Sequence, residues 1–145
     1  MSTIYFLSQY DKYSEFSNFH GAEIILDGKK WPTTEHRFQA MKFKYNPEYQ
    51  EVIRNAESPS EAKKLGSARK YKIREDWDTY RDTVMEEALY AKFTRHNDLK
   101  HLLLSTGDRE LVENNKNDSY WGIGKGSGQN KLGKMLCALR NELKK

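Results

Sequence analysis

The sequence predicts a compact α+β fold in which helices dominate. Strand patterns are concentrated before residue 32, and helical patterns occupy most of the chain from Pro32 onward. The chain has 145 residues, of which 37% are hydrophobic and 32% charged, the size and balance of one globular domain. We therefore expect a single domain over residues 1–145, with a small hairpin or sheet packed against several helices.

The expected strands are short. Residues 3–7 have the pattern of one strand, and residues 23–26 and 29–31 that of a hairpin. The hairpin strands flank Asp27-Gly28, a signal for a type I′ turn. Residues 110–114 are a further candidate strand.

Capping signals mark the first helices. Thr33 or Thr34 can cap a helix that carries residues 35–42. Pro47 suits the first turn of a second helix through Ile53. Residues 58–61, Ser-Pro-Ser-Glu, combine an N-cap serine, a proline at the first helical position and a capping-box glutamate, and so predict a third helix.

Three more helices follow. Apolar residues at helical spacing predict the longest helix from Trp77 to about Arg95, with Asp76 as its cap. Residues 97–105 form another, which Gly107 ends. Leucines on one face of residues 132–143 predict a core helix near the C-terminus.

The formal net charge of +4 favours an anionic substrate without proving nucleic-acid binding. Acidic residues interrupt most basic runs. The densest basic group could receive phosphates or be a solvated helix face with its exit loop; it consists of Lys63, Lys64, Arg69, Lys70, Lys72 and Arg74.

Several classes of protein are excluded at this stage. Cys137 is the only cysteine, so no intrachain disulfide forms, and the spaced Cys/His pairs of zinc modules are absent. The longest apolar run, residues 135–139, is far shorter than the roughly 20 residues that cross a bilayer. The first residues, Met-Ser-Thr, open no signal peptide. We expect a cytoplasmic protein with no membrane partner, metal or cofactor.

Glu35, Gln39 and Lys42 share one helical face. Seven residues of helix rise about 10.5 Å, so Glu35 and Lys42 would lie at two ends of a small-molecule site with Gln39 between them. A solvated polar stripe is the competing interpretation. His36 has no second histidine at metal-ligand spacing, which favours a core or surface residue.

Residues 117–124 place the Asp118 carboxylate and the Trp121 indole beside glycines. Residues 125–131 then lead into a helix N-terminus, where free N–H groups favour anions such as phosphate. The order of residues is neither that of a Walker loop nor that of a dinucleotide-binding loop. A plain flexible turn is the alternative.

Asn18 lies between two aromatic residues in the segment Phe16-Ser17-Asn18-Phe19, which could stack on a flat ring or form an ordinary core edge. Trp77 likewise has two interpretations: a core residue or a platform on which a substrate ring stacks. Cys137 and His20 give no positive support for a Cys/His hydrolase.

Together these stretches resemble the YbiA-like, NADAR family of N-glycosidases over nearly the whole chain. The matching segments are residues 16–19, 26–36, 39–43, 117–122 and 130–133. The resemblance implies a mostly helical α+β fold and a hydrolase that cleaves the N-glycosidic bond between a ribose and an amine. Family members act on phosphoribosylamino-pyrimidine intermediates of riboflavin synthesis or on ADP-ribose attached to guanine in nucleic acid.

By this resemblance, Glu35 is the catalytic carboxylate, Lys42 a second catalytic group, and Asp118 a catalytic or substrate-orienting acid. The residues expected to bind substrate are Asn18, Phe19, Gln39, Trp77, Trp121 and Gly122. The glycine loop 124–128 is the variable part of the match, and the resemblance implies that it contacts the substrate.

The chemistry gives these residue types a reason. Cleavage of a ribosyl C–N bond passes through an oxocarbenium-like state, which a carboxylate stabilises while an acid assists the leaving amine. Glu35 and Asp118 could divide these roles, and a desolvated Lys42 amine could attack C1′ of an opened ribose.

The expected substrate is therefore a riboflavin-pathway phosphoribosyl compound, with release of ribose 5-phosphate. The alternative is hydrolysis of ADP-ribose from guanine in DNA or RNA, with nucleic acid bound only as the modified substrate. A catalytically silent module that binds ADP-ribose or NAD is a third hypothesis. The oligomeric state stays open.

Overall fold

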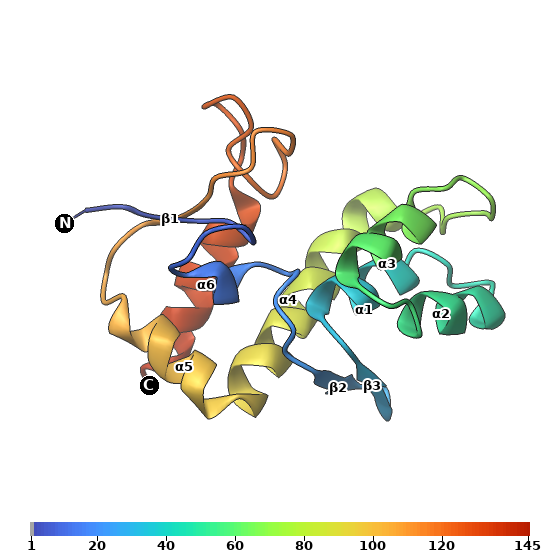
Figure 1. Cartoon of the computed structure of the whole chain (residues 1–145), viewed down its shortest axis with the longest axis horizontal. Helices are drawn as coiled ribbons and strands as arrows, with labels where there is room; N and C mark the ends of the chain where they lie inside the picture. Colours follow the sequence, from blue (N-terminus) through green and yellow to red (C-terminus); the bar gives the residue numbers. More distant parts are fainter. Residues whose placement is uncertain (1) are drawn as a thin grey trace. The chain divides into compact units, whose positions relative to one another are not determined.

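The computed structural model describes residues 2–145, which form six α-helices, four short strands and one 3₁₀ turn (Figure 1). The predicted mostly helical α+β class is confirmed. The chain divides into two compact units. One contains the residues up to His20 together with His96–Lys145, and the other is the continuous segment Gly21–Arg95. The single domain over residues 1–145 stays a prediction.

The segment Gly21–Arg95 begins with the predicted hairpin. Strand β2 (Ile24–Leu26) pairs antiparallel with β3 (Lys29–Trp31). Asp27 and Gly28 have φ values of 56° and 74°, the left-handed conformation that a type I′ turn requires at both positions.

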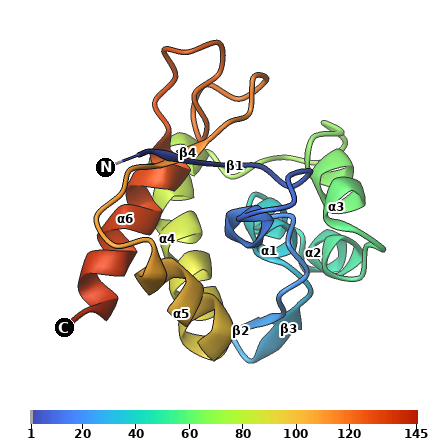
Figure 2. The ribbon, with the colours of Figure 1, turned by 60° about the vertical axis from the view of Figure 1, so that its left-hand side comes forward.

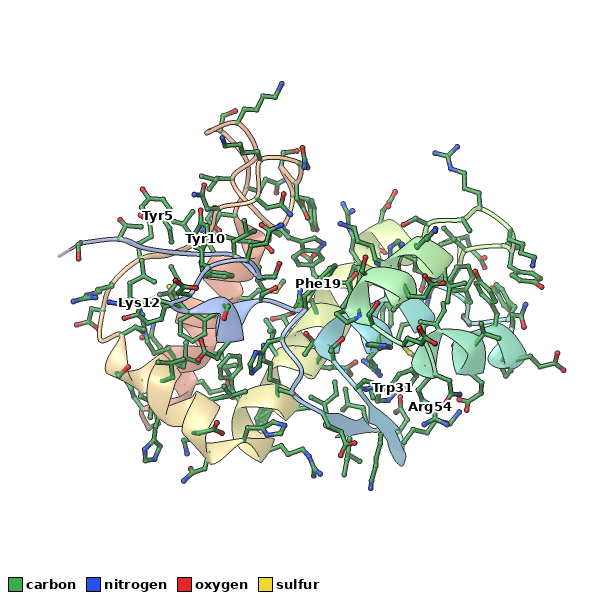
Figure 3. All side chains as sticks on the ribbon, in the orientation of Figure 1. Tyr5, Tyr10, Lys12, Phe19, Trp31 and Arg54 are labelled. Atoms are coloured by element: carbon green, nitrogen blue, oxygen red, sulfur yellow. The ribbon has the colours of Figure 1, made fainter. Side chains whose placement is uncertain are left out.

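Figure 3 labels Trp31 and Arg54 beside this hairpin. The Trp31 indole Nε1 donates to the Leu26 carbonyl at 3.2 Å, which closes the end of the hairpin. Arg54 donates from Nη1 to the Lys30 carbonyl at 3.1 Å and so ties the following helical layer to β3.

Four helices follow in this segment: α1 (Thr34–Ala40), α2 (Pro47–Arg54), α3 (Pro59–Gly66) and α4 (Trp77–Arg95). Helix α1 contacts each of the other three. The shared core is apolar and consists of Ile24, Trp31, Ala40, Phe43, Tyr49, Ile53, Ala62 and Ala88.

The predicted caps are confirmed at two helices. Thr33 Oγ1 accepts from the His36 amide at 3.1 Å, and Ser58 Oγ accepts from the Glu61 amide at 3.0 Å. Asp76 stands at the start of α4 as expected, but both of its carboxylate oxygens accept from Arg74, at 2.6 and 3.0 Å. The Asp76 side chain, which was expected to cap α4, is therefore paired with Arg74.

Helix α1 is anchored by a buried arginine. Arg37 donates to Asp27 in the hairpin turn at 3.0 Å and to Glu87 on α4 at 3.3 Å. These two contacts fix the rotation of α1 about its axis, because both partners lie on elements packed beside it. They thereby set the direction in which the predicted catalytic face points.

The second unit contains two further helices, α5 (Asn97–Ser105) and α6 (Lys131–Leu143), and a parallel pair of strands. Strand β1 (Ile4–Phe6) pairs with β4 (Leu111–Glu113), and the two strands lie side by side in Figure 2. Helix α6 packs against β4 and α5. The individual strands were predicted, but their parallel pairing and the 3₁₀ turn Ser14–Phe16 were not.

In the part of the chain that the structure describes, none of the helices combines the length and apolar character that a membrane span requires.

Candidate active site

Glu35 and Gln39 form a buried polar pair on α1. Glu35 is 7% exposed and Gln39 is 4% exposed, and Gln39 Nε2 donates to Glu35 Oε2 at 2.6 Å. A solvated stripe is therefore the wrong interpretation for these two residues. A buried carboxylate needs hydrogen-bond donors, and the glutamine amide supplies one of them.

Lys42 lies just beyond the helix that was expected to carry it. Helix α1 ends at Ala40, and the Lys42 amide donates to the Gln39 carbonyl at 3.3 Å in a tighter turn. The Lys42 carbonyl accepts from the Arg74 amide at 2.8 Å, and Lys42 Nζ donates to the Gly66 carbonyl at 3.4 Å. Lys42 is thus held against the C-terminal end of α3.

Burial lowers the pKa of the Lys42 ammonium; the nearby Glu35 carboxylate opposes this shift, and Lys63 adds to it. The net direction increases the neutral fraction of the amine. A lysine acts as a nucleophile only in that form. Gly66, whose carbonyl accepts from Lys42, also lies against Gln39, so Lys42 and the buried pair form one cluster.

His36 belongs to the core. Its Nδ1 lies 2.8 Å from Thr33 Oγ1 and its Nε2 lies 3.1 Å from the Ala56 carbonyl. A neutral ring that donates from Nε2 and accepts at Nδ1 satisfies both contacts. Of the two alternatives predicted for this histidine, core or surface, the structure shows the core.

Trp77 is a packed aromatic at the start of α4. It is 8% exposed, and its ring centroid lies 5.1 Å from that of Phe38 on α1. The core interpretation of Trp77 is therefore supported, while stacking on a substrate stays a prediction.

Asp118, in the other unit, organises a turn. Its Oδ1 accepts from the Tyr120 amide at 3.0 Å and from the Trp121 amide at 2.9 Å. A carboxylate oxygen that binds amides two and three residues ahead makes a local turn. Asp118 thereby sets the direction of the backbone that carries Trp121, which supports the substrate-orienting part of its predicted role.

The glycine loop that follows is held by its own backbone. The amides of Lys131 and Leu132 donate to the carbonyls of Tyr120 and Trp121, each at 3.1 Å. The first amides of α6 are therefore occupied. The expectation that free amides at this helix N-terminus hold a phosphate is wrong, because the preceding loop folds back onto them.

Gly122 is required by this folding. A Cβ at Gly122 would lie 2.9 Å from the carbonyl oxygens of both Asp118 and Glu113. The close approach is between backbone segments, so the structure explains this glycine without a ligand. Its predicted contact with substrate stays a prediction.

The segment 16–19 combines a core residue and a buried polar one. Phe16 is fully buried, and its ring centroid lies 5.8 Å from that of Phe6. Asn18 is 7% exposed, whereas Phe19, labelled in Figure 3, is half-buried. Substrate binding by Asn18 and Phe19 stays a prediction.

Within Gly21–Arg95, three predicted site residues therefore form one cluster: Glu35, Gln39 and Lys42. The predictions missed Gly66, which contacts two of the three. The capping signal at Ser58 predicted where α3 begins, but no local pattern indicates which helix its far end will touch.

Among residues 2–145, no group of three or more His, Cys, Asp or Glu side chains is arranged to hold a metal ion.

Residues 5–144 match the NADAR domain family. The chain is 46% identical over 141 residues to N-glycosidase YbiA of Escherichia coli strain K12, an alignment that covers 97% of this chain and 88% of that protein. It is 40% identical to an N-glycosidase of Nostoc punctiforme, over 98% of this chain and 93% of the relative.

The chain also matches a riboflavin biosynthesis protein of Vibrio vulnificus at 37% identity, over 97% of this chain and 38% of that longer protein. The solution structure of E. coli YbiA superimposes with a TM-score of 0.90 at 45% identity, and the match covers 99% of this chain and 85% of that one. Sequence and fold agree with the predicted resemblance: this chain belongs to the NADAR domain family.

Proposed function

We propose that this protein hydrolyses the ribosyl C–N bond of a phosphoribosylamino-pyrimidine intermediate of riboflavin biosynthesis and releases ribose 5-phosphate. The enzyme class, an N-glycosidase, is confirmed by relatives that carry this name at 46% and 40% identity. The match to a longer riboflavin biosynthesis protein supports the substrate class. The proposal includes a small-molecule substrate and a cytoplasmic location.

One structural observation carries the proposal: a buried carboxylate, its amide partner and a lysine with a lowered pKa lie in one cluster. Glu35 supplies negative charge for an oxocarbenium-like state or activates water. The hydrogen bond from Gln39 holds the carboxylate in one orientation. Lys42 supplies an amine whose neutral form is favoured by burial.

The lysine suggests a covalent route. When the ribose ring opens, C1′ and the leaving nitrogen form an imine. The Lys42 amine adds to C1′, the pyrimidine amine leaves with a proton from an acid, and a lysine imine results. Water then adds to C1′, which frees the Lys42 amine and the sugar aldehyde. Glu35 and Asp118 are the candidates for the acid.

The first experiment is a mass-spectrometric hydrolysis assay of 5-amino-6-(5-phosphoribosylamino)uracil and of a guanine-ADP-ribosylated oligonucleotide. We expect ribose 5-phosphate from the first substrate. Glu35→Gln should lower the rate at least about 100-fold, since it removes the carboxylate charge. Glu86→Gln is the matched control, because Glu86 is exposed on α4. No release from the phosphoribosyl substrate, or full activity of Glu35→Gln, would refute the proposal.

Borohydride added during turnover tests the covalent route. It should reduce the imine and leave a stable sugar adduct on Lys42 of the wild type. Lys42→Ala should give no adduct, whereas Lys44→Ala, which changes the exposed neighbouring lysine, should label normally. Equal labelling of Lys42→Ala would exclude the lysine imine.

A second candidate function is removal of ADP-ribose from guanine in nucleic acid. An exposed basic and aromatic surface favours it: the ammonium groups of Lys44 and Lys72 lie 5.4 and 5.3 Å from the Tyr45 ring centroid, and that of Lys70 lies 5.7 Å from that of Tyr71. Such combinations suit single-stranded nucleic acid. Release of ADP-ribose alone, with oligonucleotide binding that weakens as salt rises, would establish this function.

The third hypothesis, a silent binding module, makes a different prediction. The wild type would then turn over neither substrate, and Glu35→Gln would bind ADP-ribose as tightly as the wild type.

A further inference from the structure

Gly66, the last residue of α3, occupies a place that no side chain can share. A Cβ at Gly66 would lie 2.9 Å from Gln39 Cβ and 2.8 Å from Gln39 Cδ, and closer still to Gln39 Oε1. Gly66 does not have the left-handed φ that favours glycine. Since alanine stabilises helices relative to glycine, the reason for glycine here is space.

The same residue also holds the lysine. The Gly66 carbonyl accepts from Lys42 Nζ at 3.4 Å, at the end of α3 where the helix dipole is negative. Gly66 therefore affects two members of the cluster: its carbonyl binds Lys42, and its lack of a side chain leaves room for Gln39. The Gly66 Cα supports the Gln39 amide, which donates to Glu35, and its carbonyl orients Lys42.

The end of α3 is fixed from its other side. The Tyr49 hydroxyl of α2 donates to the Leu65 carbonyl at 2.5 Å, and Tyr49 is 6% exposed. A side chain at Gly66 could therefore be accommodated only by moving Gln39 or by breaking the Tyr49 contact. Either change would alter the cluster.

We propose that Gly66 is a positioning residue of the active site: its missing side chain seats Gln39 against Glu35, and its carbonyl holds Lys42. This inference rests on the proposed function. It assigns a role in catalysis to a residue that touches no substrate in the proposal.

The kinetic test compares Gly66→Ala with Gly21→Ala, a matched control because a Cβ at Gly21 meets nothing within 4 Å. We expect Gly66→Ala to lower kcat at least about 10-fold with a smaller change in KM, since reacting groups are misplaced rather than removed. Gly21→Ala should match the wild type.

A double-mutant cycle with Gln39→Ala separates positioning from general damage. If Gly66 acts largely through Gln39, the double variant should lose no more than about twofold relative to Gln39→Ala alone. If the activity loss of the double variant instead equals the product of the losses of the two single variants, Gly66 does not act through Gln39. If Gly66→Ala fails to fold, Tyr49→Phe replaces it, since it releases the end of α3 without adding volume.

An activity-independent measurement distinguishes failure of this inference from failure of the proposed function. Competitive acetylation of Lys42 with acetic anhydride, followed by mass spectrometry across pH, reports the neutral amine. Its midpoint should fall in Gly66→Ala, or in Tyr49→Phe, because the Gly66 carbonyl at the negative end of α3 favours the charged ammonium and that contact is lost. It should stay unchanged in Gly21→Ala. An unchanged midpoint overturns the role of Gly66, whether or not the wild type hydrolyses the substrate.

Discussion

A single buried histidine couples the stability of α1 to pH. Burial lowers the pKa of His36 below its ordinary value of 6.5, and a smaller opposing effect comes from the Ala56 carbonyl. The folded state therefore prefers the neutral ring. The resulting stabilisation is complete above the unfolded value and is lost as pH falls from about 6.5 through the lowered folded value.

We expect the urea concentration at the unfolding midpoint of the wild type to decrease when the pH is lowered from about 7.5 to about 5.5. His36→Gln should be less stable at the higher pH by about 1–3 kcal/mol, since it loses the paired ring nitrogens, and its midpoint should change less with pH. His101→Gln is the control, because His101 is exposed on α5. An equally steep pH dependence in His36→Gln would show that another group is responsible.

Residue types and spacing could predict which side chains share a face, but not whether that face is buried. The spacing of Glu35 and Gln39 suits either a small-molecule site or a solvated stripe, and the resemblance favoured the site. Their burial depends on α2, α3 and α4 packing around α1, and such contacts between helices leave no local signal. Gly66 was missed for the same reason.

At the scale of elements, local signals predicted local structure. The Asp-Gly turn, the threonine and serine caps and Gly107, whose φ is 65°, all mark boundaries that the structure confirms. The end of α1 was placed too late, since the Lys42 carbonyl bonds to Arg74, which is distant in sequence. The parallel pairing of β1 with β4 is likewise a contact between distant segments, which turn and cap signals do not report.

The turn at Asp118 gives a prediction that separates scaffold from chemistry. An asparagine at this position can still accept from the amides of Tyr120 and Trp121, whereas an alanine cannot. We expect Asp118→Asn to keep the melting temperature and most of the hydrolytic activity. Asp118→Ala should lose about 1–3 kcal/mol of stability and much of the activity.

The control for this comparison is Asn117→Ala, since Asn117 is an exposed neighbour in the same loop. Thermal unfolding and the ribose 5-phosphate assay are measured on all three variants. A folded Asp118→Asn with activity reduced as far as that of Glu35→Gln would assign the carboxylate to proton transfer instead of loop orientation.

At the scale of the whole molecule, the path of the chain bears on how many domains it forms. One unit is built from both ends of the chain, joined by the parallel pairing of β1 and β4, while Gly21–Arg95 is continuous. The family match runs through both units without a break, from residue 5 to residue 144. These two observations support the predicted single domain.

A single domain of this size should unfold in one cooperative step. The positions of the tryptophans allow the unfolding of one unit to be followed separately by fluorescence. Trp121→Phe leaves Trp31 and Trp77, which both lie in Gly21–Arg95, whereas far-UV circular dichroism also reports α5 and α6 in the other unit. We expect the fluorescence and dichroism midpoints of Trp121→Phe to coincide, because neither unit should persist once the other unfolds. Midpoints separated by more than about 3 °C would instead show two domains that melt independently.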